Sequence, residues 1–175
     1  MQSSRHSGSL SYLVTLSWSL IGLCGILAAA VVRLSPKAHE ALSSDLDAFH
    51  WVFAVLWTLF MLYTEAWRGF HKKFAPRAVS RALYLAKNGT FLQSLLGPLF
   101  CMALFHSTRR RVIASWVLTF FIVLMVLSIR LLEQPWRGLI DLGVVLGLAG
   151  GVLALAVDLL RIHRGGAPVD PELPV

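Results

Sequence analysis

The amino-acid sequence predicts an all-helical membrane protein that crosses the bilayer several times, on three observations. Hydrophobic residues make up 57% of the 175 and charged residues only 14%, with a mean hydropathy of +0.69. An average soluble domain has about 25% charged residues, so this chain has too few to cover a water-facing surface. Its apolar stretches also approach the ~20 residues that cross a bilayer. The third observation is a row of small residues in the last apolar stretch.

That stretch runs from Gln134 to Leu160 and is the helix around which we expect the others to pack. Gly143, Gly147 and Gly151 recur every four residues, the spacing that lets another helix backbone approach closely in lipid. At about 100° per residue, the predicted helix-packing stripe also takes in further residues. It comprises Gly143, Gly147, Gly150, Gly151 and Ala154, with Asp158 at its end.

The first apolar stretch, Ser11–Val32, follows a short polar start. A cleaved signal peptide is the alternative, because Ala28–Ala30 offers small residues for cleavage. The stretch exceeds the ~7–15 residues of a signal core, however, so we expect a retained span. A polar loop with Pro36 is expected over Arg33–Ala48, with Ser44 or Asp45 as the cap of a second span, Phe49–Ala66.

A strongly basic segment follows the second span. Pro76 suits the first turn of a new helix, and the apolar residues after it recur at helical spacing. This pattern predicts an amphipathic helix lying in the membrane interface. The segment's cations are candidates for binding anionic lipid headgroups, and the alternative is that they only fix topology. They are Arg68, Lys72, Lys73, Arg77 and Arg81.

Two further apolar stretches complete a set of five, namely Phe91–Phe105, which Gly97-Pro98 interrupts, and Val112–Leu132. If all five stretches span, the two sides of the membrane hold 9 and 7 basic residues. If Phe91–Phe105 instead re-enters, the split is 12 against 4, which obeys the positive-inside rule far better. We therefore favour four full spans with both termini cytoplasmic, in a bacterial inner membrane.

Residues 1–164 are predicted to form a single helical membrane domain. Residues 165–175 are rich in Gly and Pro and are predicted to be a mobile C-terminal tail. The net charge of +7 fits topology and lipid binding, and no basic soluble domain indicates nucleic-acid binding.

No local spacing in the sequence indicates a catalytic or metal site. There is no nucleophile with an adjacent base and no His or Cys pair at ligand spacing, so no cofactor is predicted. Cys24 and Cys101 both lie in apolar stretches and are expected to be small hydrophobes. The intramembrane polar candidates are Asp141, Glu65 and Asp158, each with an arginine within four residues as its ordinary partner.

Two functions of different class follow from these patterns. The first is a non-enzymatic inner-membrane subunit that packs against helices or binds lipid, with a partner membrane protein or a second copy as candidate partners. The second is a small transporter or membrane-embedded enzyme acting on a lipid-like substrate around Asp141, Glu65 and Arg68. A polar cavity reaching Asp141 or Glu65 would favour the second, and dry packing there would favour the first.

Overall fold

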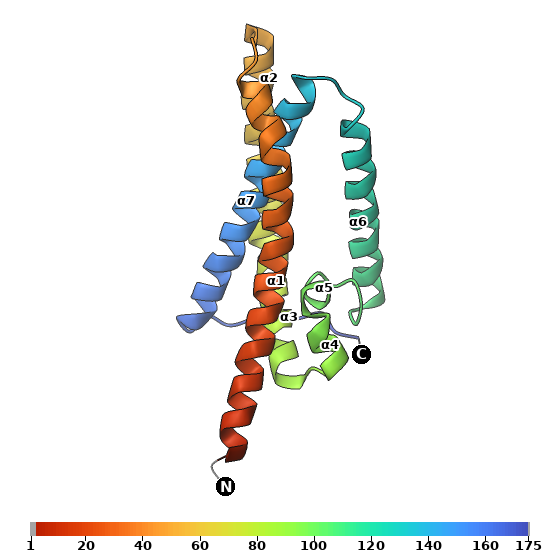
Figure 1. Ribbon diagram of the computed structural model, residues 1–175. Coiled ribbons are helices and arrows are strands. Elements are labelled where there is room, and N and C mark those ends of the chain that lie inside the picture. Colours follow the sequence, from red (N-terminus) through yellow and green to blue (C-terminus); the bar gives the residue numbers. More distant parts are fainter. Residues whose placement is uncertain (1–2, 175) are drawn as a thin grey trace.

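The computed structural model describes residues 3–174, with side chains described from residue 10, and this part of the chain is helical with no strand (Figure 1). Within these residues, four helices are long and apolar enough to cross a membrane. The segments are, in order, α1 (Ser3–Leu42), α2 (Ala48–Met61), the π-helix η1 (Leu62–Phe74), α3 (Ala75–Asn88), α4 (Phe91–Leu95), α5 (Gly97–Cys101), α6 (Arg109–Ile129) and α7 (Trp136–His163).

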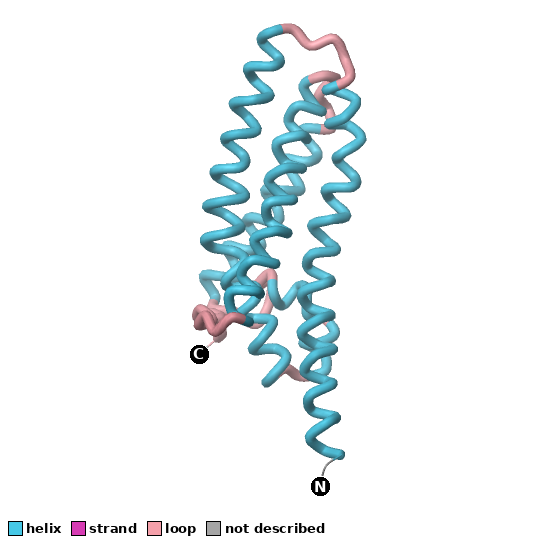
Figure 2. Tube along the Cα trace, turned by 90° about the vertical axis from the view of Figure 1, so that its left-hand side faces the viewer, coloured by secondary structure: helices cyan, strands magenta, loops and turns pink. Residues whose placement is uncertain are grey.

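The long helices run back and forth between two ends, and the loops gather at these ends (Figure 2). α1 leads to the end where α2 begins, and α2, η1 and α3 return as one helix of 41 residues, Ala48–Asn88. α6 then runs from the lower end of Figure 1 to the upper end, and α7 returns, so the N and C labels both lie at the lower end. We call this lower end the basic end, for the charges described below.

α1 is longer than the sequence pattern predicted, because it continues through Pro36 to Leu42. The expected polar loop is therefore mostly helix. Packing explains the difference: Ala41 is fully buried in a cluster with Ala54 of α2 and Leu139 of α7. Burial of this last part of α1 offsets the backbone hydrogen bond that proline removes. The cap of α2 is Asp47, whose carboxylate accepts from the His50 backbone N–H at 2.9 Å.

The expected interfacial helix also differs from what is observed. α3 does not start afresh at Pro76 but continues η1 without a break, with the junction residues Phe74 and Ala75 in helical conformation. Its buried residues are Ala75, Ala78, Val79, Ser80, Arg81, Ala82 and Leu85. Val79 and Ala82 belong to the cluster formed with Leu20 and Leu23 of α1 and with Leu155 of α7. The apolar face that was expected to lie in the membrane interface therefore packs inside the bundle at Val79 and Ala82.

The broken third stretch forms the two short helices α4 and α5 at the basic end, beside α1 (Figure 1). The Trp18 indole N–H donates to the Leu95 carbonyl at 3.0 Å. Gly97 lies so close to Ser19 that a methyl group would overlap the serine hydroxyl, and Gly22 faces Pro98 in the same way. The Gly-Pro break thus fits against small residues of α1.

α6 stands apart from the other long helices (Figure 1). Among its described side chains, only Ser115 is buried. The Trp116 indole N–H donates to the Leu104 carbonyl at 3.0 Å and ties the start of α6 to the loop before it. The apolar side chains of the rest of the helix are open on nearly every side, as expected for a helix that lipid or another protein covers.

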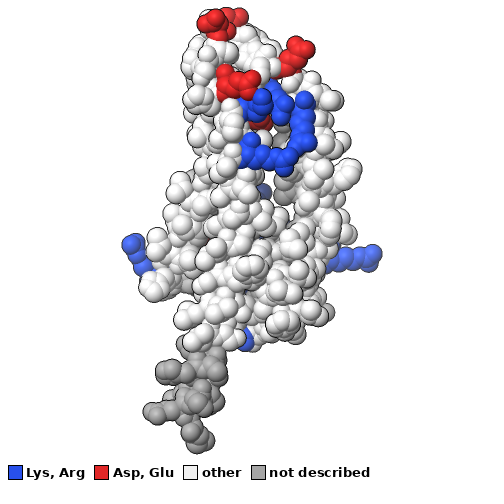
Figure 3. All heavy atoms as spheres, viewed as in Figure 1, with Lys and Arg blue, Asp and Glu red and all other residues white. Residues whose placement is uncertain are grey.

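Charges are distributed unequally between the two ends. The end where α1 meets α2 carries acidic groups and a few cations, and a broad, almost uncharged band lies below it (Figure 3). This upper end holds four cations, Arg33, Lys37, Arg130 and Arg137. The other 12 cations belong to segments in the lower half of the bundle or beyond it. They are Arg5, Arg68, Lys72, Lys73, Arg77, Arg81, Lys87, Arg109, Arg110, Arg111, Arg161 and Arg164.

The described part of the tail, residues 166–174, has no helix or strand, yet part of it contacts the bundle. The Glu172 carbonyl accepts hydrogen bonds from the Thr108 backbone N–H and from the Ser107 hydroxyl. Arg81 donates to the Pro171 carbonyl at 2.8 Å. Mobility of residues 165–175 stays a prediction, and these contacts limit it at Pro171 and Glu172.

Candidate functional site

The π-helix η1 carries the exposed part of the basic segment. In a π-helix the hydrogen bonds join residues five apart, so Arg68 and Lys73 lie on one face, one turn apart. In an α-helix, five residues at about 100° each would leave them about 140° apart. Arg68 and Lys73 line an open hollow of about 190 Å³ together with Thr64 and Gly69.

The next residues of η1 extend this basic face. Arg68, Lys72 and Lys73 are all exposed, and no ion pair occupies any of them within the described chain. The Lys72 ammonium lies 5.3 Å from the centre of the Trp67 ring, which in turn stacks on His71 at 4.8 Å. Tryptophan is typical of the headgroup level of a membrane. We call Thr64, Arg68, Gly69, Lys72 and Lys73 the η1 basic face.

Arg77 and Arg81 belong to a different surface. Arg81 is 1% exposed, and its guanidinium lies 4.3 Å from the centre of the Phe100 ring. It donates to four carbonyls, those of Phe100 (2.7 Å), Pro171 (2.8 Å), His106 (3.0 Å) and Phe105 (3.1 Å). Four of its five N–H donors are therefore used inside the protein, and its burial keeps it from a headgroup. Arg77 is half-buried and pairs with Glu172 at 3.3 Å.

The small residues of α7 lie against α2 and η1. A methyl group on Gly143 would come within 2.6 Å of the Trp57 ring, and one on Gly151 within 2.8 Å of the Phe70 ring. Gly150 faces Ala66, and Ala154 lies in the core cluster with Leu155. Each glycine therefore makes room for a larger side chain of the facing helix.

The three acids predicted to lie within the membrane are at separate points along α7 and η1. Glu65 packs on Gly147, and its buried Oε2 atom has no hydrogen-bond partner among the described residues. Asp141 is 3% exposed. Asp158 is 5% exposed and pairs through Oδ1 with the Arg161 Nε at 3.0 Å, while its Oδ2 has no partner in the described chain. The arginine expected beside Glu65, Arg68, makes no ion pair with it in the same part of the chain.

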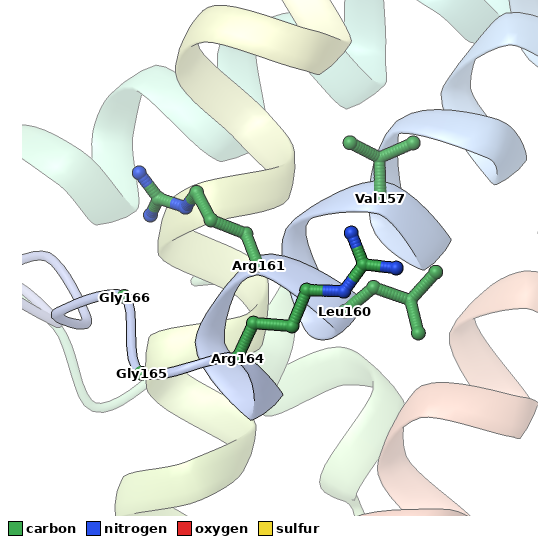
Figure 4. A pocket seen from close by; sticks show the side chains of 6 residues that line it. All are labelled: Val157, Leu160, Arg161, Arg164, Gly165 and Gly166. Carbon is green, nitrogen blue, oxygen red and sulfur yellow. The ribbon is translucent and has the colours of Figure 1, made fainter.

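A second open hollow, of about 570 Å³, lies at the end of α7. Val157, Leu160 and the backbone after Arg164 line it, and Arg161 and Arg164 extend in different directions from the helix end (Figure 4). The two guanidinium groups therefore do not converge on one ligand. Neither this hollow nor the one on η1 is lined by Glu65 or Asp141.

Sequence reasoning missed residues that join the helices through polar contacts. The Trp57 indole N–H donates to the Ile140 carbonyl at 3.1 Å and links α2 to α7. The Gln134 amide donates to the Lys37 carbonyl at 3.2 Å, while its oxygen accepts from the Gly138 backbone N–H. The partners in the two contacts between helices, Trp57–Ile140 and Gln134–Lys37, are more than 80 residues apart in sequence, so no local pattern indicates them.

Among the described residues, no three His, Cys, Asp or Glu side chains lie close enough to share a metal ion. Cys24 and Cys101 are free thiols. Comparisons with protein-family models, with curated protein sequences and with solved structures give no match. The functional argument therefore depends on the chain's own geometry.

Proposed function

We propose that the protein is a multi-pass, non-enzymatic subunit of a bacterial inner membrane, which binds anionic lipid headgroups at its basic end and supports a partner membrane protein. Both termini face the cytoplasm in this proposal, and α4 and α5 form a re-entrant segment. The 12-to-4 division of cations between the ends supports this orientation through the positive-inside rule.

One observation carries the lipid-binding role, the pairing of Arg68 and Lys73 across a turn of π-helix. Two cations on one face, with a hollow between them and Lys72 beside them, suit a phosphate group flanked by acyl chains. Each exposed cation near an anionic surface contributes about 1 kcal/mol, so three of them favour anionic over zwitterionic lipid markedly.

Neutralising Arg68, Lys72 and Lys73 together to Gln tests this role. Native mass spectrometry in mild detergent should show loss of bound anionic lipid. The matched control neutralises Lys87, Arg109 and Arg110, three exposed cations of the same end. Either variant leaves nine cations against four, so the orientation should persist. Equal loss of anionic lipid in both variants would mean that the η1 basic face acts only through the overall charge of this end. No loss in the η1 variant would refute the proposal.

A partner membrane protein is proposed because α6 is apolar on nearly all sides and packs along none of the other long helices. Co-purification in mild detergent, followed by identification of the bound protein, tests this part. Variants of Phe120 and Phe121, both exposed on α6, should reduce the yield of that protein without changing the bound lipid.

The alternative function is a small transporter or membrane-embedded enzyme acting on a lipid-like substrate. The buried Oε2 atom of Glu65, which has no hydrogen-bond partner among the described residues, favours it, because an ionisable group inside a membrane usually has a role. Under this alternative, Glu65→Gln should remove a co-purifying polar lipid that the triple η1 variant retains. Unchanged lipid content in Glu65→Gln supports the subunit.

A further inference from the structure

The tail residue Glu172 lies among cations that take no part in the η1 basic face. Its Oε1 atom is 3.3 Å from Nη1 of Arg77 on α3, and its Oε2 atom is 3.5 Å from Nε of Arg111 in the first turn of α6. All three side chains are partly open, with 23% to 34% of their surface exposed. The two arginines come from different helices, and the carboxylate bridges them.

The tail is held there mainly by its backbone. The Glu172 carbonyl accepts from Thr108 N at 3.0 Å and from the Ser107 hydroxyl at 2.7 Å, and Arg81 donates to the carbonyl of Pro171. The Asp170 carboxylate accepts from the Glu172 backbone N–H at 2.8 Å. The Glu172 carboxylate is therefore not needed to keep the tail in place, and its long contacts with the arginines make it replaceable.

The cations around Glu172 exceed the negative charge that it supplies. Arg77 and Arg111 share one carboxylate, and the neighbouring Arg81 is surrounded by neutral carbonyl groups. The first turn of α6 adds the positive end of its helix dipole. An anion with two negative charges and several acceptor oxygens would satisfy this cluster better than a single carboxylate does, since arginine binds phosphate in a bidentate manner.

We propose that Arg77 and Arg111 form a phosphate site that Glu172 occupies as a displaceable internal ligand. The ligand is a phosphate monoester or free phosphate. Because Arg111 begins a membrane span, a headgroup such as that of phosphatidic acid can reach the site from the lipid, and inorganic phosphate can reach it from water. This site is separate from the η1 basic face, and neither proposal depends on the other.

Glu172→Gln tests the site in the full chain, because it removes the competing charge and keeps the backbone contacts. A partly exposed pair of this kind changes an equilibrium by a factor of about two to five. We expect Glu172→Gln to raise the affinity for phosphatidic acid, measured by native mass spectrometry in mild detergent, by about that factor. Adding Arg111→Gln should abolish the gain.

The matched control is Asp170→Asn, which removes the other acid of the tail and keeps an oxygen for the Glu172 N–H. It should leave phosphatidic acid binding unchanged. An equal gain in Asp170→Asn, or no gain in Glu172→Gln, overturns the proposal. If Glu172 only braces the tail, Glu172→Gln should lower the melting temperature without any gain in binding. This result also overturns the proposal.

Inorganic phosphate distinguishes the two sources of ligand. If millimolar phosphate removes the gain of Glu172→Gln, the site accepts phosphate from water as well as from lipid. If the gain persists, the site is restricted to the lipid headgroup. Phosphatidylcholine, whose phosphate is covered by choline, should bind equally to all variants, and a gain there would contradict the assignment to phosphate.

Discussion

At Gly138, α7 lies against the backbone of α1, and Gly138→Ala tests whether this close approach holds the bundle together. An added methyl group would overlap the Lys37 carbonyl oxygen and lie 2.5 Å from the Ala41 Cβ atom. Neither obstacle is a flexible side chain, so the two helices must separate. Overpacking of this kind costs about 1–3 kcal/mol, and we expect the upper half of that range because the obstacle is backbone.

Alanine also returns about 1 kcal/mol through its greater helix propensity. The net loss should be about 1–2 kcal/mol, which lowers the melting temperature of a chain of this size by about 2–8 °C. Heating in detergent with a thiol-reactive fluorophore measures this, because Cys101 is buried and Cys24 is half-buried in the folded protein. The matched control is Gly25→Ala on α1, where an added methyl group meets nothing within 4 Å.

Gly25→Ala should leave the melting temperature unchanged or raise it, since it changes propensity alone. The reasoning would be refuted if Gly138→Ala were as stable as Gly25→Ala. In that case α1 and α7 would not be held at backbone contact, and the hydrogen bond from Gln134 to Lys37 could not form as described.

Three further predictions follow from single features. Arg81→Leu leaves four carbonyls without their donor and should destabilise the protein by about 3–5 kcal/mol, and a melting temperature within 2–3 °C of the wild type would contradict this. The backbone N–H of His50 lowers the pKa of the Asp47 carboxyl below its usual range. The ionised carboxylate therefore stabilises the fold at pH values above its ordinary pKa of about 3.8. This contribution is lost as the pH falls through the lowered pKa. Asp47→Asn keeps the cap, so it should lose less stability than the wild type between about pH 5 and about pH 3, and equal losses would argue against the assignment. Cysteines placed at Asp45 and Ala167 should react with an impermeant reagent from opposite sides of the membrane, Ala167 from the cytoplasm; reaction of both from one side would exclude the topology.

Composition and periodicity predicted the helical class and the approximate places of four long apolar helices, because both depend on local sequence. They placed the small residues of α7 on one face but could not say what faces them. They failed at Pro36, where a local breaker predicted a loop. Helix continues there because Ala41 is buried against α2 and α7, and that burial depends on residues far away in sequence.

Polar contacts between distant segments were beyond the reach of local patterns. The sequence offered Arg81 as a surface cation among five, and nothing nearby marks it as the buried one. Its four acceptors are backbone carbonyls, which every residue has, so no side-chain type signals them. Glu172 was likewise assigned to a mobile tail, because a single acid among Gly and Pro residues does not indicate a partner on α3 or α6.

The π-helix explains how Lys73 comes to lie with Arg68. A helical wheel at 100° per residue separates Arg68 from Lys73 by about 140° and places Lys73 within about 40° of Arg77. Each π turn contains more residues than an α turn, so η1 rotates every later side chain relative to that wheel. Arg68 and Lys73 thereby meet on one face, and Arg77 and Arg81 contact the tail and α5. The basic segment thus presents Arg68, Lys72 and Lys73 on its open face, while Arg77 and Arg81 hold Glu172 and Pro171.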